Sequence, residues 1–291
     1  MINLVQLLAT GVSVGLVYGL VAVGFVLIYK GSRIFNFAQG EMVMAGAFLT
    51  WTFIGLLKLP IIPGLLFSFL LAGLVGYGFE RFPFRPMIGQ PILAIIMATM
   101  GIAVFLHGLS ILLWANYIGI QFPRFVPEKM FYPLGIPFSS VTVGSFALVL
   151  ALVVLFGLFF YFTRTGLHMR AAAESHQLAQ SMGIRVTRVV ALSWAIAAVV
   201  STVAGFLFGY TRGIDTGLAN LGLIAIAAAL VGGLESFKGA LMGGLIIGVA
   251  ETLTGFYIGR GLKEVVPFLV MVGVVYYKPY GLFGLKRIER V

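Results

Sequence analysis

Side chains that could do chemistry are few in this sequence. Cysteine is absent, and the three histidines are scattered along the chain. A disulfide framework, a thiolate metal site and a cysteine nucleophile are therefore excluded. No nucleophile stands near a candidate base, as the active site of an enzyme requires. We predict a protein that is not an enzyme, with no metal site and no cofactor.

One cluster of polar side chains lies where an apolar segment begins. Asn36, Gln39 and Glu41 are crowded around Gly40. Asn36 could be a helix N-cap, and Glu41 would then lie in the first turn, where the helix dipole favours a negative charge. Capping leaves Gln39 unexplained. Because polar groups at membrane depth tend to face a cavity or a partner, the cluster also fits a substrate pathway.

A second polar segment, residues 164–188, has strong helix formers over 170–182 and Gly183 where a C-cap glycine is expected. Its apolar stripe is narrow and consists of Met169, Ala173, Leu178 and Met182. Arg170 and Glu174 have the i, i+4 spacing that allows pairing along a helix. The segment could be an exposed basic helix, lie on a membrane surface, or dock in a groove of a soluble partner.

Glycines dominate a third segment, residues 232–244, and Glu251 follows it. Such a density indicates close backbone contact or a break in a membrane helix. The segment lacks the spacing of a phosphate-binding loop. Glu251 and His107 each stand alone in an apolar stretch, and we interpret them as hydrogen-bonded packing or pore residues and not as a catalytic pair.

The elements that must position these residues are membrane helices. The apolar fraction is 60% and the charged fraction 10%, against about 45–50% and about 25% in soluble domains. Glycine, at 38 of 291 residues, suits close helix packing in lipid, and Gly11, Gly15 and Gly19 form overlapping GxxxG steps. We favour packing within the chain over a subunit interface. The net charge of +10 is explained by basic cytoplasmic loops and not by nucleic acid.

Nine apolar segments follow one another: residues 5–28, 38–57, 61–79, 92–114, 141–163, 189–210, 221–234, 240–258 and 265–278. The first lacks signal-peptide features and is predicted to be a retained membrane helix. The seventh is short for a crossing, as in a broken or re-entrant helix, so eight is an equally good count. We predict an all-α, polytopic transmembrane helix bundle of eight or nine membrane segments, forming one domain over residues 1–291.

The connections between these segments predict the orientation. If the N-terminus lies outside and the loops alternate, 13 of the 19 lysines and arginines fall on the inside. This is the bias of membrane proteins, whose cytoplasmic loops are enriched in basic residues. We therefore predict a multi-pass protein with the N-terminus outside and the C-terminus cytosolic. The connection 115–140, with Pro123, Pro127, Pro133 and Pro137, is predicted to be an ordered external loop.

Taken together, the polar and glycine-rich segments resemble the LivH-like permease subunits of branched-chain amino acid ABC transporters. The similar blocks occur in the order typical of that family and cover nearly the whole chain: residues 36–41, 80–81 with 85–86, 165–172 with 182–184, 232–251 and 278–284. Each block alone is a modest signal, whereas the ordered set is specific.

The resemblance implies a channel-forming permease subunit of an importer in the bacterial inner membrane. Implied partners are membrane lipid, a second, related but non-identical permease, two cytosolic ATP-binding subunits and a periplasmic substrate-binding protein. The expected substrate pathway comprises Asn36, Gln39, Gly40, Glu41 and Glu251. The expected ATPase-coupling residues are Gly166, Arg170, Ala171, Ala172, Glu174, Leu178, Gly183 and Ile184.

Two departures from the family pattern leave the substrate open. Glu235 stands where the family has glycine, and residues 224–228 lack its usual lysine and aromatic residue. Branched-chain amino acids, other amino acids, urea, short amides and aromatic acids all remain candidates. The alternative function is an ion-coupled secondary transporter of a small polar solute, which predicts inverted repeats. Only a faint, same-orientation similarity between residues 37–46 and 237–244 is visible.

Overall fold

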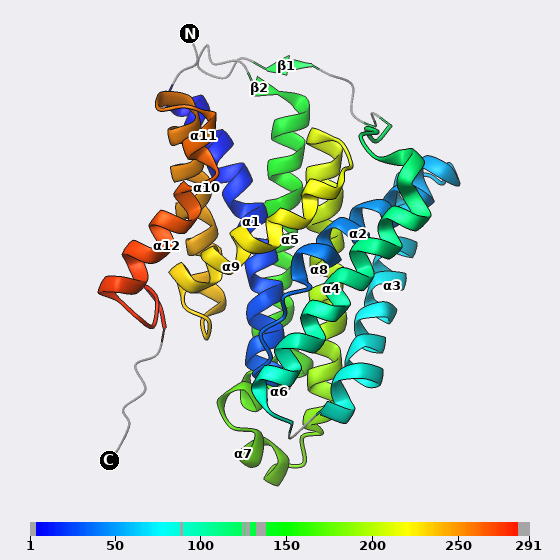
Figure 1. Cartoon of the computed structure of the whole chain (residues 1–291), viewed down its shortest axis with the longest axis vertical. Coiled ribbons are helices and arrows are strands. Elements are labelled where there is room, and N and C mark those ends of the chain that lie inside the picture. Colours follow the sequence, from blue (N-terminus) through cyan, green and yellow to red (C-terminus); the bar gives the residue numbers. More distant parts are fainter. Residues whose placement is uncertain (1–3, 88–89, 124, 126–128, 132–137, 285–291) are drawn as a thin grey trace.

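The computed structural model describes residues 4–87, 90–123, 125, 129–131 and 138–284, and their structure is almost entirely helical (Figure 1). The longer helices are α1 (Leu4–Ser32), α3 (Ile61–Phe79), α4 (Ile92–Trp114), α5 (Ser140–Phe162), α8 (Val186–Arg212) and α10 (Phe237–Tyr257). The shorter ones are α2 (Gln39–Trp51), α6 (Arg164–Glu174), α7 (His176–Ser181), α9 (Leu221–Gly232), α11 (Arg260–Lys263) and α12 (Val266–Tyr277). Every predicted apolar segment contains a helix, and the all-α class is confirmed.

Among the described residues, five helices are long and apolar enough to cross a membrane, namely α1, α4, α8, α10 and α3 with its continuation to Met87. The number is six if the bent pair α5 and α6 forms one span. Helices α2, α9 and α12 are shorter than the bilayer requires. A polytopic helical bundle is therefore confirmed, whereas the count of eight or nine membrane segments is not.

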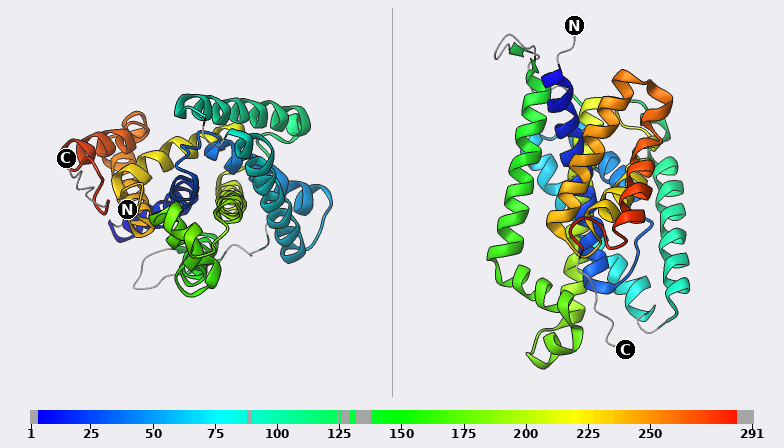
Figure 2. Two further views of the ribbon diagram at one scale, coloured as in Figure 1. Left: turned by 90° about the horizontal axis from the view of Figure 1, so that it is seen from below. Right: turned by 90° about the vertical axis from the view of Figure 1, so that its left-hand side faces the viewer.

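Helices α1 and α8 lie near the centre of the bundle, with α4 and α12 at its outside (Figure 2). The α1 glycines face α10, as expected for packing within the chain: a Cβ atom on Gly15 would lie 2.8 Å from the carbonyl oxygen of Gly244, and one on Gly11 would lie 2.9 Å from Cα of Val249. Only glycine allows two helix backbones to approach so closely.

Two short helices begin inside the bundle. Residues 33–38 are not helical, and α2 starts at Gln39 and ends in a π-helical turn, Thr52–Leu56. A 3-10 turn, Thr216–Asn220, precedes α9. The two starts touch, because a Cβ atom on Gly222 would lie 2.5 Å from Cα of Gly40. The short α9 with its irregular start fits the predicted broken helix.

The predicted helix over 170–182 is wrong in its continuity, because the structure has two helices there. Helix α6 ends at Glu174, and Ser175 has extended backbone angles. The Ser175 hydroxyl accepts a hydrogen bond from the Leu178 N–H at 3.3 Å and so caps α7. Serine favours such caps because its hydroxyl competes with the helical backbone bonds. Helices α5 and α6 also meet at a sharp bend of 73°.

The proline-rich connection is described in part. Pro123 belongs to the described residues, whereas Pro127, Pro133 and Pro137 lie outside them. Two short strands, β1 (Met130–Phe131) and β2 (Phe138–Ser139), pair antiparallel, with Met130 opposite Ser139. Shorter turns elsewhere are the π-helical Glu80–Phe84 and the 3-10 segments Arg85–Met87 and Ala115–Tyr117.

Candidate functional site

Asn36 shapes the entry into α2 but is not its N-cap. The N-cap is Ala38, which has no side-chain capping bond, so the capping prediction for Asn36 is wrong. Asn36 instead closes a local turn, since its Oδ1 accepts from the Ala38 N–H at 3.1 Å. Asparagine commonly makes this bond two residues along the chain. Its Nδ2 donates to Gln39 Oε1 at 3.1 Å, which links the turn to the helix.

Gln39 is fully buried between helices. Its Nε2 donates to the Ser201 hydroxyl of α8 at 2.8 Å, and a Cβ atom on Gly24 of α1 would lie 2.6 Å from the same nitrogen. The amide oxygen accepts from Asn36 and the amide nitrogen donates to Ser201, so both ends of this buried polar group have a partner. Gln39 thereby connects α2 to α8 and packs closely against α1.

Glu41 lies in the first turn of α2, as predicted. Its carboxylate oxygens lie 3.1 and 3.2 Å from Nδ1 of His107 on α4. This contact agrees with the interpretation of His107 as a hydrogen-bonded residue, and the structure supplies its partner. The pairing was not visible in the sequence because the two residues are 66 positions apart and belong to helices whose contact depends on the fold.

Glu251 occupies a different place from the α2 cluster. It lines a cavity of about 370 Å³ between α1, α8, α9 and α10, together with Tyr18, Arg212, Asn220, Lys263 and Glu264 among others. Glu251 Oε1 lies 3.2 Å from Nζ of Lys263, so Glu251 also has a polar partner. The start of α2 lies next to this cavity, because Gly40 packs against the turn that contains Asn220.

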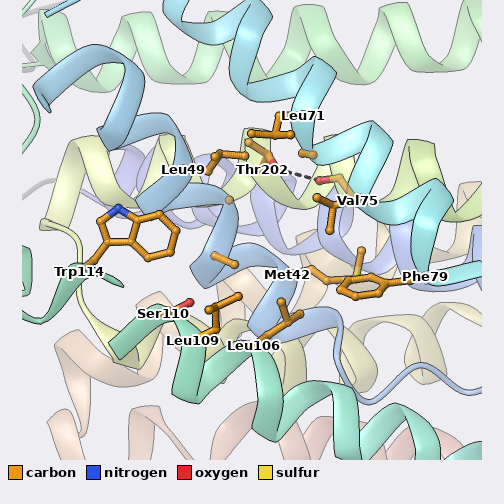
Figure 3. A pocket seen from close by; sticks show the side chains of 14 residues that line it. Met42, Leu49, Leu71, Val75, Phe79, Leu106, Leu109, Ser110, Trp114 and Thr202 are labelled. Atoms are coloured by element: carbon orange, nitrogen blue, oxygen red, sulfur yellow. Dashed lines mark hydrogen bonds between the residues drawn. The ribbon is translucent and has the colours of Figure 1, made fainter. Parts of the chain in front are cut away.

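A second cavity, of about 180 Å³, is apolar. It lies between α2, α3, α4 and α8 and is lined by side chains such as Met42, Leu71, Leu106 and Trp114 (Figure 3). The Thr202 hydroxyl on its wall donates to the Ala198 carbonyl at 2.9 Å. With so few polar groups, this cavity suits apolar contents such as lipid chains and not a charged solute.

The predicted coupling segment projects from one end of the bundle (Figure 2, right). Thr163 caps α6 by accepting from the Gly166 N–H at 3.0 Å, and a Cβ atom on Gly166 would clash with the Phe160 carbonyl. Arg170 donates to that same carbonyl and lies over the Phe160 and Tyr161 rings at 5.5 Å, so it turns toward α5 and away from Glu174.

The apolar stripe of this segment is divided between its two helices. Met169, Ala172 and Ala173 of α6 are buried, while Ala171 and Ile184 are half-buried. Leu178 is 68% exposed and Met182 81% exposed, and both point away from the bundle. Gly183 has φ of +78°, which confirms the predicted C-cap glycine.

Two ion pairs were missed by the sequence analysis, although most of their residues had been singled out. Arg33 Nη1 lies 2.6 Å from Glu235, the acid that departs from the family pattern. Burial lowers the pKa of Arg33, but the hydrogen bond and charge of Glu235 outweigh burial and raise that pKa above its usual value. Arg85 pairs with the buried Glu80 at 2.8 Å. A buried acid in an apolar helix is itself a signal for a cationic partner.

Such features define a multi-pass helical membrane protein with internal cavities. The sequence matches, over residues 7–275, the family described as the permease component of branched-chain amino acid transport systems. The chain belongs to this family. Its relatives are transport permease subunits and not enzymes.

Individual relatives extend over nearly the whole chain. The branched-chain amino acid permease protein BraD of Pseudomonas aeruginosa is 30% identical over 98% of this chain and 97% of its own length. The LivH permease protein of Salmonella typhimurium is 29% identical with the same coverage. A probable LivH protein of Methanocaldococcus jannaschii is 30% identical over 94% of this chain and 90% of its own.

A solved structure shares the fold. It is PsaBC from Streptococcus pneumoniae in complex with Fab, which matches with a TM-score of 0.51 over 94% of this chain and 91% of the matched chain. At 15% sequence identity, this likeness concerns the arrangement of the helices alone.

Proposed function

We propose that this chain is the channel-forming permease subunit of an ABC importer for branched-chain or related amino acids in the bacterial inner membrane. A periplasmic binding protein delivers the substrate, and a second, related permease completes the channel. Two cytosolic ATP-binding subunits supply the energy. The observation that carries the proposal is the family match over residues 7–275, together with relatives similar along their whole length.

The orientation proposed is N-terminus outside and C-terminus cytosolic. The start of α1 and α7 lie at opposite ends of the bundle (Figure 1). With α7 in the cytosol, 13 of the 19 basic residues are on the cytosolic side in the loop count. A cysteine introduced at Ser175 should then react only with reagents that reach the cytosol, and labelling by an impermeant reagent in intact cells would contradict this orientation.

Helix α7 is the proposed contact with the ATP-binding subunit. Leu178 and Met182 form a small exposed apolar surface beyond the end of the bundle, as a helix that docks in a groove requires. Arg170 and Gly166 fix α6 to the end of α5, so a push on α7 is transmitted to the membrane helices. Within the α2 cluster, Asn36, Gln39, Gly40 and Glu41 are proposed to support the substrate pathway.

The function is tested by uptake into vesicles that contain this chain and its co-expressed partner subunits. We expect radiolabelled L-leucine, or another amino acid among the candidates, to accumulate only with ATP inside and the binding protein outside. Uptake that follows an ion gradient and ignores ATP would contradict the proposal and favour an ion-coupled secondary transporter.

The docking contact is tested with Leu178→Asp, which places a charge in an apolar contact. We expect the ATP-binding subunit to be lost during purification. Gln177→Asp is the matched control, because Gln177 is an exposed polar neighbour on the same helix. If α7 lies on the membrane surface instead, Leu178→Asp will leave the ATP-binding subunit bound.

Gly183→Val tests the angle at which α7 ends. A β-branched residue at a φ of +78° is strained by about 1–2 kcal/mol, so ATP hydrolysis should continue with reduced transport. Asparagine tolerates this conformation better, and Gly183→Asn should restore part of the coupling. Normal coupled transport by Gly183→Val would contradict a role for this cap.

A further inference from the structure

The cavity around Glu251 contains a polar atom that the fold leaves without a partner. Glu251 is 5% exposed, and its Oε1 pairs with Lys263. Its other oxygen, Oε2, is buried and makes no hydrogen bond among the described residues, and the Tyr18 hydroxyl on the same wall interacts with both Glu251 and Arg212. A buried, unpaired carboxylate oxygen is rare because it costs free energy, so a water, an ion or a ligand is expected near the Glu251 carboxylate.

The charges on the cavity wall balance. Arg212 and Lys263 contribute positive charges, and Glu251 and Glu264 contribute negative ones. A cavity of this kind suits a solute with one charge of each sign and no net charge. The Arg212 guanidinium lies over the Phe208 ring, 4.8 Å from its centre, on one side of the cavity. Glu251 is on α10, so the two signs are presented from different helices.

Apolar side chains occupy the rest of the wall. Leu221, Leu223 and Ile224 of α9 and Phe268 of α12 line the same space. The cavity volume of about 370 Å³ falls within the range of small-molecule sites. An aliphatic side chain would bury its apolar surface here while its charged groups meet the charged wall.

We propose that this cavity is the site at which the permease binds a zwitterionic amino acid, with the Glu251 carboxylate accepting from the α-ammonium group and Arg212 donating to the α-carboxylate. The inference rests on the proposed function and goes beyond it by assigning a role to each charge. Lys263 pairs with Oε1 of Glu251 and is not assigned a contact with the substrate.

The test compares three probes that share one carbon skeleton. L-leucine carries both charges, 4-methylpentanoate lacks the ammonium group, and 3-methylbutylamine lacks the carboxylate. Each is titrated against the full chain, purified in nanodiscs with its partner subunits, by equilibrium binding. We expect L-leucine to bind more tightly than either analogue.

Two variants separate the two charges. Glu251→Gln should weaken binding of L-leucine and 3-methylbutylamine by about 10- to 100-fold, as expected for a lost hydrogen bond to a charged group, and leave 4-methylpentanoate unchanged. Arg212→Gln should weaken L-leucine and 4-methylpentanoate and leave 3-methylbutylamine unchanged. This crossed pattern is not expected from a general loss of folding.

Lys263→Met is the control for a merely structural ion pair. It removes the Lys263 charge but keeps the Glu251 carboxylate, so L-leucine binding should be retained or become tighter. An equal loss for all probes in Glu251→Gln and Lys263→Met would overturn the proposal. So would loss of the second permease from the purified Glu251→Gln complex, because the cavity would then be a subunit contact.

The same preparation distinguishes failure of the site from failure of the proposed function. If L-leucine is taken up with ATP but does not bind the complex through these charges, the cavity assignment is wrong and the importer stands. If uptake of L-leucine and of the other candidate solutes is independent of ATP, the function is wrong, whatever the binding measurements show.

Discussion

Two regions of this bundle are equally apolar in sequence yet differ in what covers them. In the most apolar stretch of α1, 83% of the residues are buried within the chain, and in α8 72%. The corresponding values are 22% for α3 with its continuation and 11% for α4. Hydrophobicity therefore identifies a membrane helix without telling whether protein or lipid is its neighbour, because lipid chains are as apolar as leucine.

The glycines of α1 and α4 show the same difference. A Cβ atom on Gly15 of α1 would lie 2.8 Å from the backbone of α10. A Cβ atom on Gly101 or Gly108 of α4 would have no atom within 4 Å. Gln39 and Ser201 bond to each other inside the central region. Close backbone contact therefore distinguishes α1 from α4.

The largest effect is expected from a substitution in the central region. Gly15→Leu would drive a side chain into the backbone of α10, and we expect a loss of stability at the upper end of about 1–3 kcal/mol, with little folded protein recovered. Gly101→Leu on α4 is the matched control and should leave the yield unchanged. Size-exclusion profiles of the purified variants measure both. Equal damage by Gly101→Leu would mean that another subunit, and not lipid, covers α4.

A smaller effect is expected from the buried amide network. Gln39→Leu leaves the Ser201 hydroxyl and the Asn36 amide without their partner, at a cost of about 1–3 kcal/mol, and should lower transport. Ser201→Ala tests the same bond from the other side. Thermal unfolding of both single variants and the double variant should show non-additive losses. Strict additivity would show that the two side chains act independently.

The smallest effect concerns the contact between the two regions. Glu41 and His107 join α2 to α4, but the His107 side chain is 41% exposed, so their coupling is expected to be below about 1 kcal/mol. A double-mutant cycle with Glu41→Ala and His107→Ala, measured by thermal unfolding, determines it. A coupling of several kcal/mol would show that α4 is bound to the core much more firmly than its exposure indicates.

The local features of the chain were predictable from sequence. Apolar segments of the right length gave helices, Gly183 has the left-handed conformation expected of a C-cap, and Glu41 lies in a first helical turn. The ordered family blocks predicted the transport class, which the family match confirms. Features of this kind depend on residues close together in the chain, where periodicity and capping are informative.

The break at Ser175 was only partly predictable from the local sequence. A serine followed by six helix-compatible residues could continue a helix or cap a new one, and propensity alone favours continuation. In the fold, α6 is held against α5 by Arg170 and by the close contact at Gly166, and α7 leaves in another direction. Tertiary contacts thus selected the capped break over a single helix.

By itself, the sequence determined that this protein is a helical membrane permease, because composition, segment length and motif order need no knowledge of neighbours. The tertiary structure alone decided that Gln39 bonds to Ser201, that Glu41 meets His107, and that Glu251 shares a cavity with Lys263. These pairs join separate elements. Which partner a buried polar group finds depends on how the helices pack, and many packings are compatible with one apolar pattern.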